Sequence, residues 1–135
     1  MEPLYLLDTN ILSEQLKKSP DQKVLNFLEE NESTIATCSI VIHELQYGME
    51  LLEDSKKKKI LETYIKSIQD TLPIFEYDSQ SAIWHAKEKS RLSKLGKTPT
   101  FVDGQIASIA HIHKLKVITK NEKDFKIFKV EVVGF

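Results

Sequence analysis

The sequence predicts an α/β fold: a three-layer α/β/α sandwich around a short, mainly parallel sheet of four or five strands. Short apolar runs alternate along the chain with longer segments of helical period. No two-residue hairpin turn joins any pair of these runs, so helical crossovers are expected to connect parallel strands. The 135 residues are enough for one domain with its own core, which we expect to span residues 1–135.

The first half of the chain opens on an apolar run, Tyr5 to Leu7, that ends on a carboxylate, Asp8. A run bounded in this way is typical of a buried strand that delivers an acid to the edge of a sheet. The other elements expected in this half are, in order, a helix over 11–18, a helix over 21–30, a strand over 33–37, and a helix that Ser39 caps and that ends near Leu52.

In the second half, apolar residues at helical spacing and turn residues mark the boundaries. Apolar side chains between Ile60 and Ile68 share one face, which predicts a helix over 56–71. Asp78 or Ser79 is suited to cap a long helix to Leu95, and Gly96 is a natural stop after it. The remaining elements expected are a strand over 73–75, a helix over 99–114, and strands over 116–119 and 130–133.

Composition narrows the class of protein. The formal net charge is −1, which argues against a simple polyanion-binding protein, although lysines cluster at 56–59 and between 87 and 97. Cys38 is the only cysteine, so an intramolecular disulfide and a thiolate metal cluster are excluded. The chain shows no signal peptide and no apolar run that could span a membrane, so we expect a cytoplasmic protein.

Two acids in the first half have surroundings that need an explanation. Asp8 either caps the following helix, as Asp, Thr and Asn commonly do, or serves a site at the end of the strand. Glu44 has Ile40, Val41, Tyr47 and Gly48 as its helical neighbours, so it projects from the apolar side of its helix. A carboxylate there needs a partner, which is either a lysine or a metal ion.

Two further acids follow in the second half. Thr100 and Asp103 have the spacing of a capping box, yet Asp103 also shares a helix face with Ile106 and so can point toward the sheet. Asp124 follows a strand and reads either as a surface turn acid or as part of a site.

Together these acids lie at strand ends and helix starts, where a parallel sheet gathers its ligand-binding edge. Converging carboxylates repel one another and raise one another's pKa unless a cation lies among them. Oxygen ligands suit Mg²⁺ or Mn²⁺ rather than zinc. His111 and His113 are two residues apart and diverge on a helix, so they do not form a chelating pair. Ions of this kind position water and stabilise the in-line transition state of phosphodiester cleavage.

Four segments resemble motifs of the PIN-domain family, and within it of the VapC-type toxins of bacterial and archaeal toxin–antitoxin pairs. Their order and spacing match along nearly the whole chain, which is more specific than any single motif. The segments are Leu7-Asp8-Thr9-Asn10-Ile11, Glu44-Leu45-x-Tyr47-Gly48, Arg91 to Gly96 through Asp103-x-x-Ile106-Ala107, and Thr119-x-Asn121-x-x-Asp124-Phe125.

The resemblance implies a PIN-like fold and a Mg²⁺-dependent endoribonuclease that acts as a toxin, usually dimeric and inhibited by a partner antitoxin. Asp8, Glu44 and Asp103 match the acidic cluster and the metal ligands. The fourth position is either Asn121 as a neutral ligand or Asp124. Polar positions that support the site in the family match Asn10 and Thr119.

Basic residues before Asp103 are candidates for binding the RNA backbone: Arg91, Lys94 and Lys97. A solvated helix face is the alternative for the lysines. Trp84 is expected in the core or at an interface. The alternative to the nuclease is a non-catalytic PIN-like module that binds RNA or protein, and Asn121 in the fourth motif is the feature that favours it.

Overall fold

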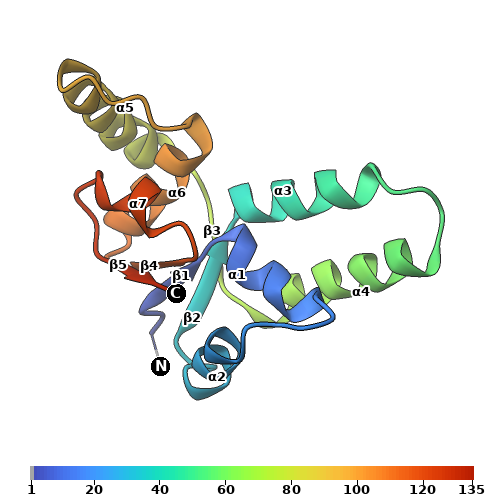
Figure 1. Ribbon diagram of the computed structural model, residues 1–135. Helices are drawn as coiled ribbons and strands as arrows, with labels where there is room; N and C mark the ends of the chain where they lie inside the picture. Colours follow the sequence, from blue (N-terminus) through green and yellow to red (C-terminus); the bar gives the residue numbers. More distant parts are fainter. Residues whose placement is uncertain (1) are drawn as a thin grey trace.

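The five strands form one sheet with the order β3-β2-β1-β4-β5, and every pair of neighbours is parallel. The structure is a computed structural model, and it describes residues 2–135. Figure 1 shows the sheet with helices on both sides, so the α/β/α class and the parallel sheet predicted from the sequence are confirmed. The strands are β1 (Tyr5–Leu7), β2 (Ile35–Cys38), β3 (Ile74–Phe75), β4 (Lys116–Thr119) and β5 (Val132–Gly134).

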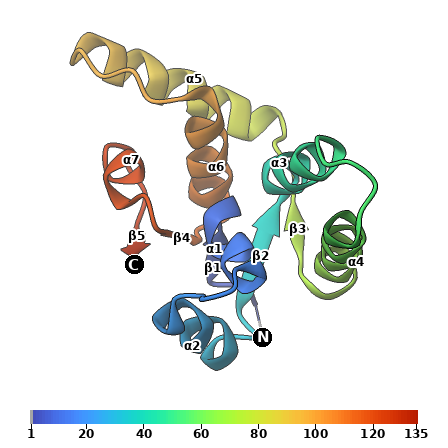
Figure 2. The ribbon, with the colours of Figure 1, turned by 45° about the vertical axis from the view of Figure 1, so that its right-hand side comes forward.

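Two pairs of helices lie side by side, α3 with α4 and α5 with α6 (Figures 1 and 2). No helix within residues 2–135 is long and apolar enough to cross a membrane. The helices are α1 (Thr9–Ser13), the 3₁₀ turn η1 (Glu14–Leu16), α2 (Gln22–Glu30), α3 (Ser39–Glu50), α4 (Lys56–Thr71), α5 (Ser79–Lys94), α6 (Phe101–Ile112) and α7 (Glu122–Lys126).

Several predicted boundaries are corrected by the structure. The helix expected over 11–18 begins at Thr9, because Asp8 caps it, and it tightens into η1 after Ser13. Asp124 lies in the short helix α7 rather than in a turn. Cys38, not Ser39, occupies the N-cap position of α3, and it makes no side-chain cap bond. The second strand begins two residues later than expected, and so does the last strand.

Other predicted boundaries are confirmed. Asp78 caps α5 by accepting a hydrogen bond from the backbone N–H of Ser81 at 2.9 Å. Gly96 follows the end of α5 with φ +74°, a left-handed conformation that glycine adopts without strain. Trp84 is half-buried and stacks on the ring of His111, with centroids 4.3 Å apart.

The core lies where the central strands meet the helices. β1 and β4 lie side by side in the middle of the sheet, and Leu6, Leu7, Val117 and Ile118 on them are fully buried. Because all strands are parallel, their carboxyl ends share one edge of the sheet. Asp8 and Thr119 are therefore brought to the same place, although they stand at opposite ends of the sequence.

Candidate active site

Asp8 is fixed at the end of β1 through both of its carboxylate oxygens. Oδ1 accepts a hydrogen bond from the backbone N–H of Ile11 at 3.1 Å, which makes Asp8 the N-cap of α1. Oδ2 accepts a hydrogen bond from the hydroxyl of Thr119 at 2.5 Å. Asp8 thus caps its helix and also faces the end of β4, so the two interpretations that the sequence left open are compatible.

The acids at this edge act on one another electrostatically. Burial raises the pKa of Asp8 above its ordinary value, and the nearby charges of Asp103 and Glu44 raise it further. Burial likewise raises the pKa of Asp103, with added contributions from Asp124 and Glu44. Asp8 is therefore close enough to feel the charges of Asp103 and Glu44, and Asp103 is close enough to feel those of Asp124 and Glu44.

Glu44 projects from α3 and is partly buried. Its Oε1 accepts a hydrogen bond from the hydroxyl of Thr9, at 2.5 Å. No lysine or arginine forms an ion pair with Glu44 in residues 2–135, so the salt bridge considered from the sequence is absent from that range. Thr9 is a residue that sequence reasoning missed, because only the placement of α1 against α3 brings it to Glu44.

Asp103 lies in the first turn of α6, as its spacing predicted. The hydroxyl of Thr100 caps this helix by accepting a hydrogen bond from the backbone N–H of Asp103 at 3.1 Å. The Asp103 side chain is partly buried and lines a hollow of about 410 Å³ together with Lys97, Lys123 and Asp124. The backbone of Asp103 thus takes part in the cap of α6 while its side chain lines the hollow.

Thr119 connects the segment after β4 to the acidic edge, by which we mean the edge of the sheet that carries Asp8, Glu44 and Asp103. It is fully buried, and its hydroxyl oxygen accepts a hydrogen bond from the backbone N–H of Asn121 at 2.8 Å while donating to Asp8. Asn121 is exposed at the N-cap of α7, without a side-chain cap bond. Asn10 is also exposed, and it lies in the first turn of α1, which Asp8 caps.

The basic candidates separate into two kinds. Arg91 is held by buried Glu88, with Nε 2.6 Å from Oε2 and Nη2 3.2 Å from Oε1, and Nη2 also donates to the carbonyl of Ile127 at 3.0 Å. These contacts join α5 to the segment after α7, which gives Arg91 a structural role. Lys94 and Lys97 are exposed.

The donor set at this edge consists of carboxylate and amide oxygens, which are the ligands that Mg²⁺ and Mn²⁺ prefer. In the part of the chain that the structure describes, no three His, Cys, Asp or Glu side chains stand close enough to hold one ion. The chemistry of the residues fits such an ion, and their present arrangement does not yet enclose it.

A comparison with family models matches residues 5–130 to the PIN domain. The chain belongs to the PIN-domain family. Toxin FitB of Neisseria gonorrhoeae is 32% identical over 138 residues, covering 98% of this chain and 96% of FitB. Ribonuclease VapC2 of Rickettsia felis is 32% identical, covering 91% and 90% of the two chains. The crystal structure of FitAcB from Neisseria gonorrhoeae superposes with a TM-score of 0.91 at 31% identity, covering 97% of each chain. The family that the resemblance indicated is thus confirmed.

Proposed function

We propose that this protein is a divalent-metal-dependent endoribonuclease and the toxin of a toxin–antitoxin pair. The observation that carries the proposal is the position of Asp8, which lies where β1 ends, is bonded to Thr119 at the end of β4, and is close enough to feel the charges of Asp103 and Glu44. Two relatives that cover nine tenths or more of the chain are named a toxin and a ribonuclease, which supports the same activity.

The proposed ligands of Mg²⁺, or of Mn²⁺ in its place, are Asp8, Asp103 and Glu44. Asp124 or Asn121 supplies a fourth oxygen, and Asp124 is favoured because its charge already raises the pKa of Asp103. Such an ion, when bound, makes a water molecule more acidic and offsets negative charge on the phosphodiester. Held among these acids, it would offset the repulsion between their charges.

The other residues of the site orient the carboxylates or attract the RNA. Thr119 holds one oxygen of Asp8, and Thr9 holds one oxygen of Glu44, so neither carboxylate rotates freely. The ammonium groups of Lys94 and Lys97 bind the phosphates of the RNA backbone, and Lys97 does so beside Asp103. Asn10 is proposed as a polar support at the start of α1. Arg91 contributes to stability rather than to RNA binding.

The test is cleavage of purified RNA with Mg²⁺ present. Asp8→Asn and Asp103→Asn are expected to abolish cleavage and growth toxicity, since asparagine keeps the shape of the side chain and caps helices as well as aspartate does. Asp54→Asn, at an exposed acid in the segment between α3 and α4, is the matched control. EDTA should stop cleavage by the wild-type protein. Full cleavage by either site variant contradicts the mechanism.

A non-catalytic RNA- or protein-binding module is the second candidate, favoured by the uncharged Asn121 in the fourth motif. It predicts RNA binding that EDTA leaves intact and no cleavage under any metal. The same assay therefore separates the two functions.

An antitoxin and a second copy of the chain are the proposed protein partners, and the cytoplasm, where RNA is present, is the proposed location. An open groove of about 910 Å³ between α2 and α4, lined by apolar residues such as Leu25 and by the acids Glu29 and Glu30, offers an antitoxin a surface of mixed polarity. Exposed Ile83 and Phe101 offer a second copy an apolar surface. Co-purification with the product of an adjacent gene and light scattering of the isolated protein test these partners.

A further inference from the structure

Glu14 is a buried acid that lies outside the acidic edge and that the proposed chemistry does not use. Its side chain is almost completely buried, in the 3₁₀ turn that follows α1. Oε1 accepts a hydrogen bond from the backbone N–H of Asp21 at 2.8 Å, and Oε2 lies 2.9 Å from Nζ of Lys17. These hydrogen bonds lower the pKa of Glu14 to about 2. Glu14 is thus an anion at every physiological pH.

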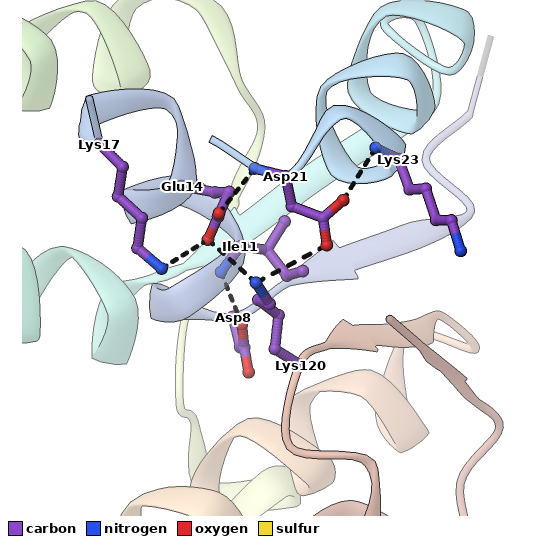
Figure 3. A network of polar contacts seen from close by, with 7 residues as sticks. All are labelled: Asp8, Ile11, Glu14, Lys17, Asp21, Lys23 and Lys120. Carbon is purple, nitrogen blue, oxygen red and sulfur yellow. Dashed lines mark hydrogen bonds and ion pairs between the residues drawn. The ribbon is translucent and has the colours of Figure 1, made fainter. Parts of the chain in front are cut away.

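The third partner of Glu14 comes from the other end of the sequence. Nζ of Lys120 lies 3.3 Å from Oε2 of Glu14 and 3.7 Å from Oδ2 of Asp21. Figure 3 shows the Lys120 side chain directed toward these two acids rather than toward the Asp8 carboxylate. Lys120 directly follows Thr119, whose hydroxyl bonds Asp8. A lysine at the edge of the site is therefore held by acids outside it.

The acidic edge would attract this lysine if it were released. Among residues 2–135, no ion pair involves Asp8, Glu44 or Asp103, so their charges are not neutralised by the protein. A lysine side chain is long and flexible, and an ammonium group gains Coulomb energy near several uncompensated carboxylates. An ammonium paired with Asp8 would occupy the place of the cation and lower the affinity for it.

We propose that Glu14, together with Asp21, is a positioning residue that holds the Lys120 ammonium away from Asp8 and so keeps Asp8 available to a divalent cation. The proposal rests on the proposed metal-dependent activity and adds a role for residues outside the four motifs. It differs from a purely structural role, because it predicts that removing Lys120 repairs the loss of Glu14.

The experiment compares Glu14→Gln, Lys120→Met and the double variant with the wild-type protein. Glutamine keeps the acceptor for the Asp21 N–H and removes only the charge. We expect Glu14→Gln to bind Mn²⁺ about tenfold more weakly by calorimetry, the size typical of residues that support metal ligands, and to need correspondingly more Mg²⁺ for cleavage. Lys120→Met and the double variant are both expected to bind Mn²⁺ with an affinity within about threefold of the wild-type value.

Lys17→Met is the matched control, because it removes a cation from Glu14 without touching Lys120. It should leave Mn²⁺ affinity at the wild-type level. If Glu14→Gln does not fold, Asp21→Asn weakens the hold on Lys120 from the other side and is expected to act in the same direction.

A double variant as weak as Glu14→Gln, or a Glu14→Gln protein with wild-type affinity, overturns the proposal while leaving the proposed nuclease intact. A wild-type protein that neither binds Mn²⁺ nor cleaves RNA instead removes the proposed function, and this inference with it. Thermal unfolding of each variant separates lost affinity from lost structure.

Discussion

The hydroxyl of Thr119 donates a hydrogen bond of 2.5 Å to Oδ2 of Asp8, and the two residues are 111 positions apart in the sequence. Both side chains are buried, and the bond joins the ends of the two central strands. It is therefore at once part of the fold and part of the site. The first prediction concerns this bond.

Thr119→Val keeps the shape of the side chain and removes the hydroxyl. Because the lost bond goes to a buried carboxylate, we expect the free energy of unfolding to fall by about 1.5–3 kcal/mol, as measured by urea denaturation. RNA cleavage should also fall, since Asp8 is no longer fixed. Thr119→Ser, which retains the hydroxyl, is the control. Equal stability of the valine and serine variants contradicts the prediction.

Gly104→Ala is expected to destabilise the packing of α5 against α6. A Cβ at this position would overlap Nε2 of the buried His85 ring, and the Nδ1 atom of that ring is held by a hydrogen bond of 2.8 Å with the hydroxyl of Tyr77. Overpacking of this kind costs about 1–3 kcal/mol in the free energy of unfolding. Gly48→Ala in α3 is the control: with no atom within 4 Å of the added Cβ, it should gain about 0.5–1 kcal/mol. A small or absent loss at Gly104 contradicts the packing argument.

Asp103→Asn is expected to stabilise the metal-free protein at pH 7. The folded-state pKa of Asp103 is raised, so the folded state loses stability as pH rises from the unfolded value of 3.8 through the raised value. The asparagine variant has no such loss. In EDTA, its unfolding temperature should exceed that of the wild type at pH 7, and this advantage should disappear below pH 3.8. An advantage that is the same at both pH values points to another cause.

Glu14 has the opposite pH dependence, because its folded-state pKa of about 2 is below the ordinary value of 4.5. The contribution of Glu14 to the free energy of unfolding is complete above pH 4.5 and is lost as pH falls toward 2. Wild type should therefore lose more stability than Glu14→Gln between pH 5 and pH 3, as followed by urea midpoints. Parallel curves for the two proteins over this interval contradict the assignment.

Arg91→Ala and Lys97→Ala should have contrasting effects. Loss of Arg91 leaves buried Glu88 without its guanidinium partner, so stability should fall more than RNA affinity. Loss of exposed Lys97 should weaken RNA binding, reduce its dependence on salt and leave stability nearly unchanged. Fluorescence anisotropy with labelled RNA and thermal unfolding measure the two effects. A large loss of RNA affinity in folded Arg91→Ala returns Arg91 to the RNA-binding set.

The sequence was informative where local patterns decide the outcome. The class, the parallel strands and the capping residues Asp78 and Thr100 follow from periodicity and helix-cap chemistry. The contacts of Thr9 with Glu44 and of Thr119 with Asp8 do not, because they depend on how elements distant in sequence dock. The pairing of Glu88 with Arg91, by contrast, has the i, i+3 spacing of a helical ion pair and was accessible from the sequence.

The sheet order has a consequence for when Asp8 is oriented during folding. β1 carries Asp8 and lies between β2 and β4, and β4 is formed by residues near the other end of the chain. We expect β1 and β4 to pair late in folding, because closing so long a loop costs entropy before the contacts between the strands form. An incompletely folded chain thus carries its acids without Thr119 to orient Asp8. The hydrogen bond that orients Asp8 therefore exists only once β4 has paired with β1.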